Sequence, residues 1–137
     1  MRLAIFLVSL SLAVPATAAR QQLDTLTPQQ AISRATAASP KPVRAVFQFK
    51  VGNAAKARDG YWLDSDHNFR SAANLGIVLR LSAMPGLTQK YGQDLKSAFV
   101  GKTIKVIGQV RRVAVARGKA TATQVEVTHA GQVLSVS

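Results

Sequence analysis

The sequence predicts a small, mostly β domain: five strands in a Greek-key barrel, one helix between strands three and four, and a short N-terminal helix. Three observations predict this class. Apolar and polar residues alternate in several segments, which is typical of strands with one buried face. A helical pattern separates the third of these segments from the fourth. Gly108 interrupts the longest segment, where a barrel strand needs a bulge or bend.

The first nineteen residues predict a secretory signal peptide. Met1 and Arg2 precede an apolar run from Leu3 to Val14, and small residues follow Pro15. About a dozen apolar residues are too few to span a bilayer, which takes roughly 20. We expect cleavage after Ala18 or Ala19 and a periplasmic or secreted protein, the alternative being an uncleaved N-terminal anchor. The expected organisation is a signal peptide over 1–19, a helix and linker over 20–42 and a barrel over 43–137.

The composition predicts a basic surface without thiol chemistry. The chain has 18 Lys and Arg against 6 Asp and Glu, and removal of residues 1–19 takes only Arg2 from this set. Such an excess attracts polyanions: nucleic acid, lipopolysaccharide or phospholipid head groups, or acidic wall polymers. The alternative is that the charge serves solubility alone. The absence of cysteine excludes disulfides, thiol catalysis and thiolate zinc sites.

A short helix is predicted to begin at Pro28 and to end near Ala37. Thr27 can cap it, proline suits the first helical position, and Gln30 completes a capping box. Its apolar stripe is thin, so we expect a marginal helix unless it packs on the domain. The prolines at 40 and 42 end it and impose an extended backbone.

The first three strands are predicted at 43–51, 61–65 and 75–81. The first is the strongest, because its odd positions are all apolar and its even ones are mostly polar or basic. Asn53 to Gly60 is predicted to be a loop. The segment 66–68 is predicted to be a turn, since Asp and Asn favour turns.

The second half predicts a helix, two strands and a closing segment. Four apolar residues at intervals of four indicate a helix over 87–99, which Gly92 weakens and Gly101 ends. Strands are expected at 103–115 and 123–128, a basic loop at 116–121 and a short segment at 132–136. This order is the plan of the OB-fold, the alternative being another small β-barrel or an α+β sheet.

Several segments resemble small bacterial OB-fold domains. Tyr61 to Arg70 and Ala73 to Leu79 are similar to that family's Leu-(Asp or Asn)-Ser strand end, Tyr-Arg turn and Asn-led apolar strand. Gly101 to Val110 resembles its Gly-Lys-x-(Val or Ile)-x-Val-x-Gly strand, and 124–133 resembles its last strand and the segment after it. The resemblance covers about 43–136 and implies a nucleic-acid-binding type of domain. Phe69 stands where the family has tyrosine, and the Gly-x-Pro before its last strand is absent.

The candidate binding site lies on the second and third strands and on the loops beside them, where OB-folds bind ligands. A basic groove with an aromatic platform suits single-stranded nucleic acid, because charges follow phosphates while rings stack on bases. Trp62 is either this platform or a cap on the barrel, and for Phe69 the sequence favours the core. The predicted binding residues are Lys56, Arg58, Trp62, Arg70, Arg111, Arg112, Arg117 and Lys119.

Metal binding and catalysis are not expected. The run from Asp64 to Asn68 is similar to a calcium loop, but Phe69 and Leu75 stand where the required glycine and glutamate belong. A nuclease could draw only on Asp64, Asp66, Arg70 and Glu126, and a metal-assisted one needs carboxylates that converge on one ion. We expect a non-enzymatic protein without a cofactor that binds single-stranded nucleic acid or another polyanion. The alternative is an envelope module that binds a protein or an anionic glycolipid.

Overall fold

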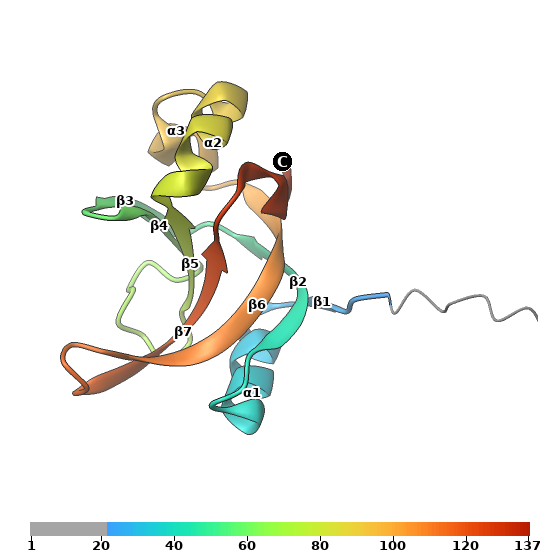
Figure 1. The fold of residues 1–137 in the computed structure, drawn as a ribbon, viewed down its shortest axis with the longest axis vertical. Helices are drawn as coiled ribbons and strands as arrows, with labels where there is room; N and C mark the ends of the chain where they lie inside the picture. Colours follow the sequence, from blue (N-terminus) through green and yellow to red (C-terminus); the bar gives the residue numbers. More distant parts are fainter. Residues whose placement is uncertain (1–21) are drawn as a thin grey trace, which may run out of the picture.

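The computed structural model describes residues 22–137 (Figure 1). The elements of this part of the chain are β1 (Thr25–Leu26), α1 (Pro28–Ala38), β2 (Val43–Lys50), β3 (Asn53–Ala57), β4 (Gly60–Asp64), β5 (Leu75–Arg80), the 3-10 helix η1 (Leu81–Ala83), α2 (Met84–Tyr91), α3 (Leu95–Phe99), β6 (Thr103–Val115), β7 (Ala120–Val127), the 3-10 helix η2 (Ala130–Gln132) and β8 (Val133–Val136). The predicted signal peptide lies outside the described residues. Within them, no helix has both the length and the apolar character needed to cross a membrane.

The strands form one mixed sheet of eight strands, where the sequence predicted five. Their order is β1-β2-β6-β7-β5-β4-β3, and β8 pairs with β6. β5 and β7 pair in parallel, whereas β6 is antiparallel to β2, β7 and β8. Only Val51 and Gly52 separate β2 from β3, although these strands lie far apart in the order of the sheet. The mostly β class with few helices is thus confirmed.

β3 corrects the prediction of a loop from Asn53 to Gly60. This alanine-rich segment has low strand propensity, but it pairs with β4 along its whole length and buries Ala54 opposite Leu63. Tertiary burial therefore outweighs the local preference. The turn that follows is tight, and an added Cβ at Gly60, whose φ is +151°, would lie 1.9 Å from the Leu79 carbonyl oxygen. Only glycine fits this position.

The helix predicted over 87–99 is two helices. Gly92 ends α2 with a φ of +94°, and the Asp94 carboxylate then caps α3 by accepting a hydrogen bond from the Ser97 amide. The apolar pattern that predicted one helix is nevertheless buried. Leu87, Leu95 and Phe99 all belong to the core.

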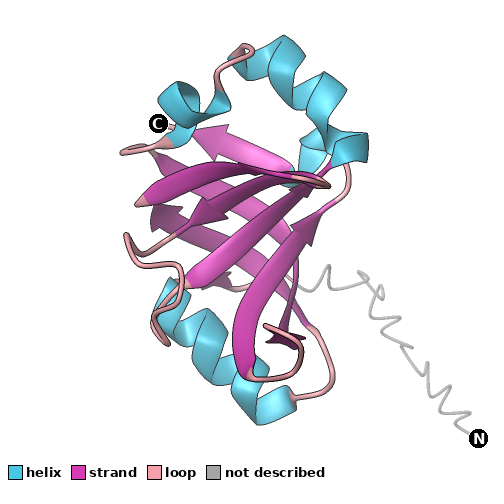
Figure 2. Ribbon diagram, turned by 90° about the vertical axis from the view of Figure 1, so that its left-hand side faces the viewer, coloured by secondary structure: helices cyan, strands magenta, loops and turns pink. Residues whose placement is uncertain are grey.

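α1 packs on the sheet as part of the core. Its capping box is confirmed: the Thr27 hydroxyl accepts a hydrogen bond from the Gln30 amide, and the Gln30 side chain accepts one from the Thr27 amide. Ala31 and Ala35 are both 0 % exposed, and Leu26 of β1 is buried beside β2. α1 lies at one end of the sheet, and α2 and α3 lie at the other (Figures 1 and 2).

The alternation that predicted the long strands is confirmed by burial. In β2, Ala45, Phe47 and Phe49 are buried, whereas the even positions between them are at least partly exposed. In β6, Ile104, Val106 and Val110 are buried, and the face that carries Gln109 and Arg111 is outside. The inner face of each strand thus supplies the core.

Candidate nucleic-acid interface

Trp62 lies on the outer face of the sheet. In the strand register it is opposite Ala55 of β3 and Val78 of β5, and Val78 is in turn opposite Glu126 of β7. Its neighbour Leu63 points into the core, which confirms that the tryptophan faces the other way. Val78 is only 2 % exposed although it lies outside the core cluster. Trp62 and Glu126 are its cross-strand neighbours on this face.

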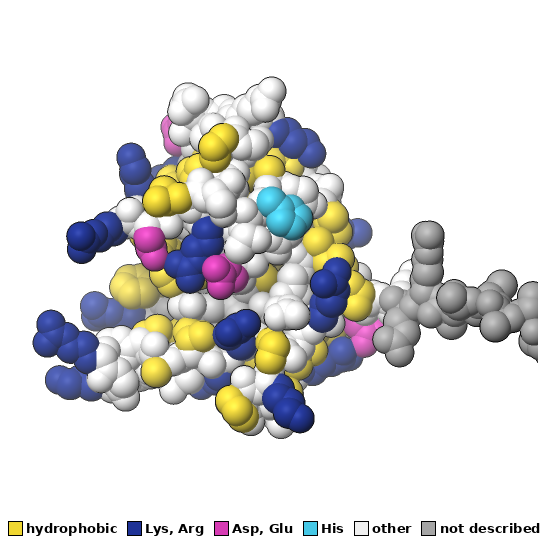
Figure 3. All heavy atoms as spheres, viewed as in Figure 1, with side chains coloured by type: hydrophobic (Ala, Val, Ile, Leu, Met, Phe, Trp, Pro, Cys, Tyr) yellow, Lys and Arg dark blue, Asp and Glu magenta, His cyan; other side chains and the backbone are white. Residues whose placement is uncertain are grey.

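Three loops lie on one side of the molecule beside this face. They are the β3–β4 turn, the loop 65–74 and the β6–β7 turn, all at the left in Figure 1. Figure 2 looks at this side and shows the strands between the loops uncovered by any helix. Lys and Arg side chains project along the same edge in Figure 3. The exposed basic residues of these loops are Arg58, Arg70, Arg117 and Lys119.

The loop 65–74 is organised by Asn74. Its Nδ2 donates to Asp64 Oδ1 at 2.9 Å and to the Phe69 carbonyl at 3.3 Å, and its Oδ1 accepts from the Asp66 amide at 3.0 Å. Asp66 accepts from the Asn68 amide and Asn68 from the Arg70 amide, two residues ahead in each case. The Asp and Asn residues thus serve as turn formers, as their side chains commonly do.

This loop exposes Phe69, which the sequence placed in the core. Its carbonyl oxygen is held by Asn74, while its side chain is 58 % exposed. The Arg70 guanidinium carbon lies 5.3 Å from the centre of the Phe69 ring, within the range of a cation–π contact. The prediction of a core position was therefore wrong, because the turns of the loop and not apolarity decide where this ring lies.

Two predicted residues lie on the other face of their strands. Lys56 is opposite Tyr61, so its side chain leaves the sheet on the face away from Trp62. α3 packs against β3, and burial together with the negative charge of Asp94 raises the pKa of Tyr61. Arg112 is opposite Thr123 and donates to its hydroxyl at 2.8 Å. Strand alternation separates Arg112 from Arg111 in the same way.

Two acidic groups near the interface, Asp59 and Glu126, are paired with Arg80. Arg80 holds Asp59 at 2.9 Å through Nη1 and Glu126 at 2.9 Å through Nε. Throughout residues 22–137, ion pairs form only at Arg80 and Arg34. The four basic loop residues therefore lack carboxylate partners in this part of the chain, and their charge remains available to an anion.

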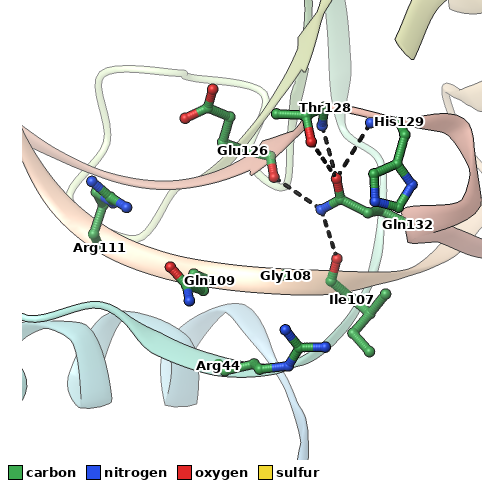
Figure 4. Close-up of a pocket in the computed structure, with 9 residues that line it drawn as sticks. All are labelled: Arg44, Ile107, Gly108, Gln109, Arg111, Glu126, Thr128, His129 and Gln132. Carbon is green, nitrogen blue, oxygen red and sulfur yellow. Dashed lines mark hydrogen bonds between the residues drawn. The ribbon is translucent and has the colours of Figure 1, made fainter. Parts of the chain in front are cut away.

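A groove of about 380 Å³ crosses the outer face next to η2 (Figure 4). β6 and β7 separate here, since their pairing ends at Val110 and Val125. The Gln132 side chain bridges the gap by donating to the carbonyls of Ile107 at 3.0 Å and Glu126 at 3.1 Å. An added Cβ at Gly108 would lie 3.0 Å from Val125 Cγ1 and 3.2 Å from Gln132 Nε2. Gly108 thus permits the close approach of Val125 and Gln132. The sequence predicted a bulge or bend at Gly108, but the register shift of β6 lies between Lys105 and Val106.

Two arginines line this groove. Arg111 was predicted as a binding residue, and Arg44 of β2 was not. Arg44 occupies an exposed even position of β2, the strand that the sequence predicted most strongly. Only the pairing of β2 with β6 places it in the same groove as Arg111. Figure 4 shows the two side chains on neighbouring strands with Gln109 between them, and their guanidinium groups extend in different directions.

Asp64 makes a pH-dependent contribution to the stability of the folded protein. Its side chain is buried, and burial raises its pKa; the Asn74 hydrogen bond partly opposes this, and the negative charge of Asp66 adds to it. A pKa above the unfolded value means that the folded state binds the proton more tightly, so stability from this group falls as pH rises through that interval. Asp64→Asn removes the charge and keeps an oxygen acceptor for Asn74. We expect the variant to be more stable than wild type at pH 7.

Urea unfolding between pH 3 and pH 7 measures this effect. The gain from Asp64→Asn should shrink as pH falls and vanish below the ordinary pKa of aspartate, where both proteins are neutral at this position. A loss of stability that is equal at every pH would show instead that the carboxylate is needed for its hydrogen bond. Asp66→Asn removes a charge that also raises the pKa of Asp64, so it should give a smaller gain of the same sign.

Comparison with protein-family models and with curated proteins finds no match for this chain. Its function is therefore inferred from its own residues. Within residues 22–137, no three His, Asp or Glu side chains gather closely enough to hold a metal ion.

Proposed function

We propose that this chain is an exported, non-enzymatic OB-fold protein that binds single-stranded nucleic acid, or a similar polyanion, on the outer face around Trp62. The sheet order supports the fold. If β2 and β3 are the two halves of one bent first strand, β4, β5, β6 and β7 are strands two to five. The helices between β5 and β6 and the parallel β5–β7 pair then match the Greek-key plan of an OB-fold. β1, β8 and α1 are additions to it.

The observation that carries the binding proposal is the position of the indole among unpaired cations. Trp62 is partly exposed on the outer face of β4, the second strand of the proposed barrel. The turns that flank the ligand in OB-folds, between strands one and two and between four and five, carry Arg58, Arg117 and Lys119. Arg70 adds a charge, and the exposed Phe69 beside it offers a second stacking surface.

The β6–β7 turn supports a binding role for Arg117. Ala116 and Arg117 have φ values of +51° and +56°, a region that side-chain-bearing residues rarely adopt. Glycine or asparagine would hold this backbone with less strain. A cation at a strained turn position is consistent with selection for a contact and not for local stability.

Tryptophan fluorescence tests the proposal directly, because Trp62 is the only tryptophan of the chain. We expect oligothymidylate to quench it at low salt, and the affinity to fall as salt rises. If Arg58, Arg70, Arg117 and Lys119 each neutralise one phosphate, the slope of log K against log salt is about −3.

Three outcomes would count against this function. A folded protein whose emission does not respond to oligonucleotide at low salt lacks the interface. A response to lipopolysaccharide vesicles but not to oligonucleotide would favour the envelope partner. Degradation of the oligonucleotide in the presence of a divalent metal would show an enzyme.

A further inference from the structure

The groove beside η2 is lined by two arginines, Arg44 and Arg111, and by one carboxylate, that of Glu126. Arg44 is opposite Gln109 in the register, and Arg111 lies two residues farther along the same face of β6. Such diagonal neighbours are about 7–8 Å apart between Cα atoms, close enough for two long side chains to reach one ligand. Both arginines are exposed, and neither forms any of the ion pairs found in residues 22–137.

The remaining groups of the groove leave these charges available. Glu126 is the only acidic residue that lines it, and its carboxylate is held by Arg80 at 2.9 Å. The Gln132 side chain is fully used, since it donates to two strand carbonyls and accepts from the Thr128 amide at 2.8 Å. Gln109 lies between the two arginines as a further neutral donor, and His129 lines the end next to η2 (Figure 4).

We propose that this groove binds a phosphate group between the guanidinium groups of Arg44 and Arg111. A planar guanidinium group can donate two hydrogen bonds to a pair of phosphate oxygens. Because phosphate is tetrahedral, it can accept such pairs of hydrogen bonds from two guanidinium groups on different sides. A volume of about 380 Å³ admits the phosphate together with a small attached group such as a sugar. A carboxylate would form paired hydrogen bonds with one guanidinium group and leave the charge of the other guanidinium group uncompensated.

This site lies on the same outer face as Trp62, but apart from it along the sheet. Arg111 on β6 is three strands away from Trp62 on β4, which corresponds to about 14 Å along the sheet. The inference does not depend on the proposed function, because a phosphate can come from a small phosphomonoester or from a nucleic-acid strand.

NMR titration of the ¹⁵N-labelled protein with inorganic phosphate at low salt and constant pH tests the site. We expect shifts of the side-chain Nε signals of Arg44 and Arg111 and of the Gln109 amide. The double variant Arg44→Gln/Arg111→Gln should bind phosphate about tenfold more weakly, as expected for the loss of charge-assisted hydrogen bonds.

A matched control separates the groove from net charge. Lys50 and Lys105 lie on the same two strands, on the same outer face and with the same diagonal spacing, but they do not line the groove. Lys50→Gln/Lys105→Gln should leave phosphate binding unchanged. The proposal is overturned if the two double variants lose equal affinity, or if phosphate shifts neither arginine.

Oligothymidylates with and without a 5′-phosphate identify the source of the phosphate. If Arg44→Gln/Arg111→Gln loses affinity only for the 5′-phosphorylated oligothymidylate, the groove recognises a strand end. If it loses the same affinity for both oligothymidylates, the groove recognises an internal phosphate. If neither oligonucleotide binds while inorganic phosphate still titrates the groove, the proposed function fails and a small phosphomonoester is the supported ligand.

Discussion

Replacement of Trp62 by alanine is expected to weaken binding of oligothymidylate by on the order of ten- to a hundredfold. Stacking of a base on an aromatic ring contributes about 1–3 kcal/mol, and Trp62 is the aromatic residue that the sheet presents between the basic loops. Because the variant lacks the fluorescent residue, fluorescence anisotropy of a labelled oligonucleotide measures the affinity. The salt slope should stay near the wild-type value, since the phosphate contacts remain.

Two variants control this experiment. Trp62→Phe keeps a ring at the position and should recover most of the lost affinity. Phe69→Ala removes the exposed ring of loop 65–74 and should cause a smaller loss if the strand extends over that loop. Wild-type affinity in a correctly folded Trp62→Ala would show that the ligand does not contact this face.

Removal of residues 22–42 is expected to lower the free energy of unfolding by about 3–5 kcal/mol. Burial of a leucine contributes about 1.5–3 kcal/mol and each buried methyl group about 0.8 kcal/mol, and this segment buries Leu26, Ala31 and Ala35. Deletion of this segment also removes β1, which pairs with β2. For a domain with a total stability of about 5–15 kcal/mol, the effect is large and is read directly from urea unfolding.

Point variants locate the source of this stability. Leu26→Ala should cost about 2–5 kcal/mol, as for other buried leucines. Leu23→Ala, at a half-buried position before β1, is the matched control and should cost much less. If a chain that begins at residue 43 unfolds at the same urea concentration as one that begins at residue 22, α1 is an appendage and not part of the core.

Strand alternation, which the sequence shows, separates some of the predicted binding residues onto opposite faces. Arg111 and Arg112 are adjacent, so they had to point to opposite faces once the strand was assigned. The sequence predicts a loop around Lys56, and side chains in a loop do not alternate between two faces. The strand β3 then put it on the face away from Trp62.

The amino-acid order by itself determined which segments form the long strands, which of their faces is buried and where α1 begins. These features depend on residues near one another along the chain: the alternation in β2, the pattern of β6 and the capping box at Thr27. Only the tertiary structure decided that residues 53–57 form a strand, that the thin stripe of α1 enters the core and that Arg44 and Arg111 line one groove. The physical reason is that pairing and burial between distant segments contribute more free energy than the weak local preferences of alanine-rich or polar residues.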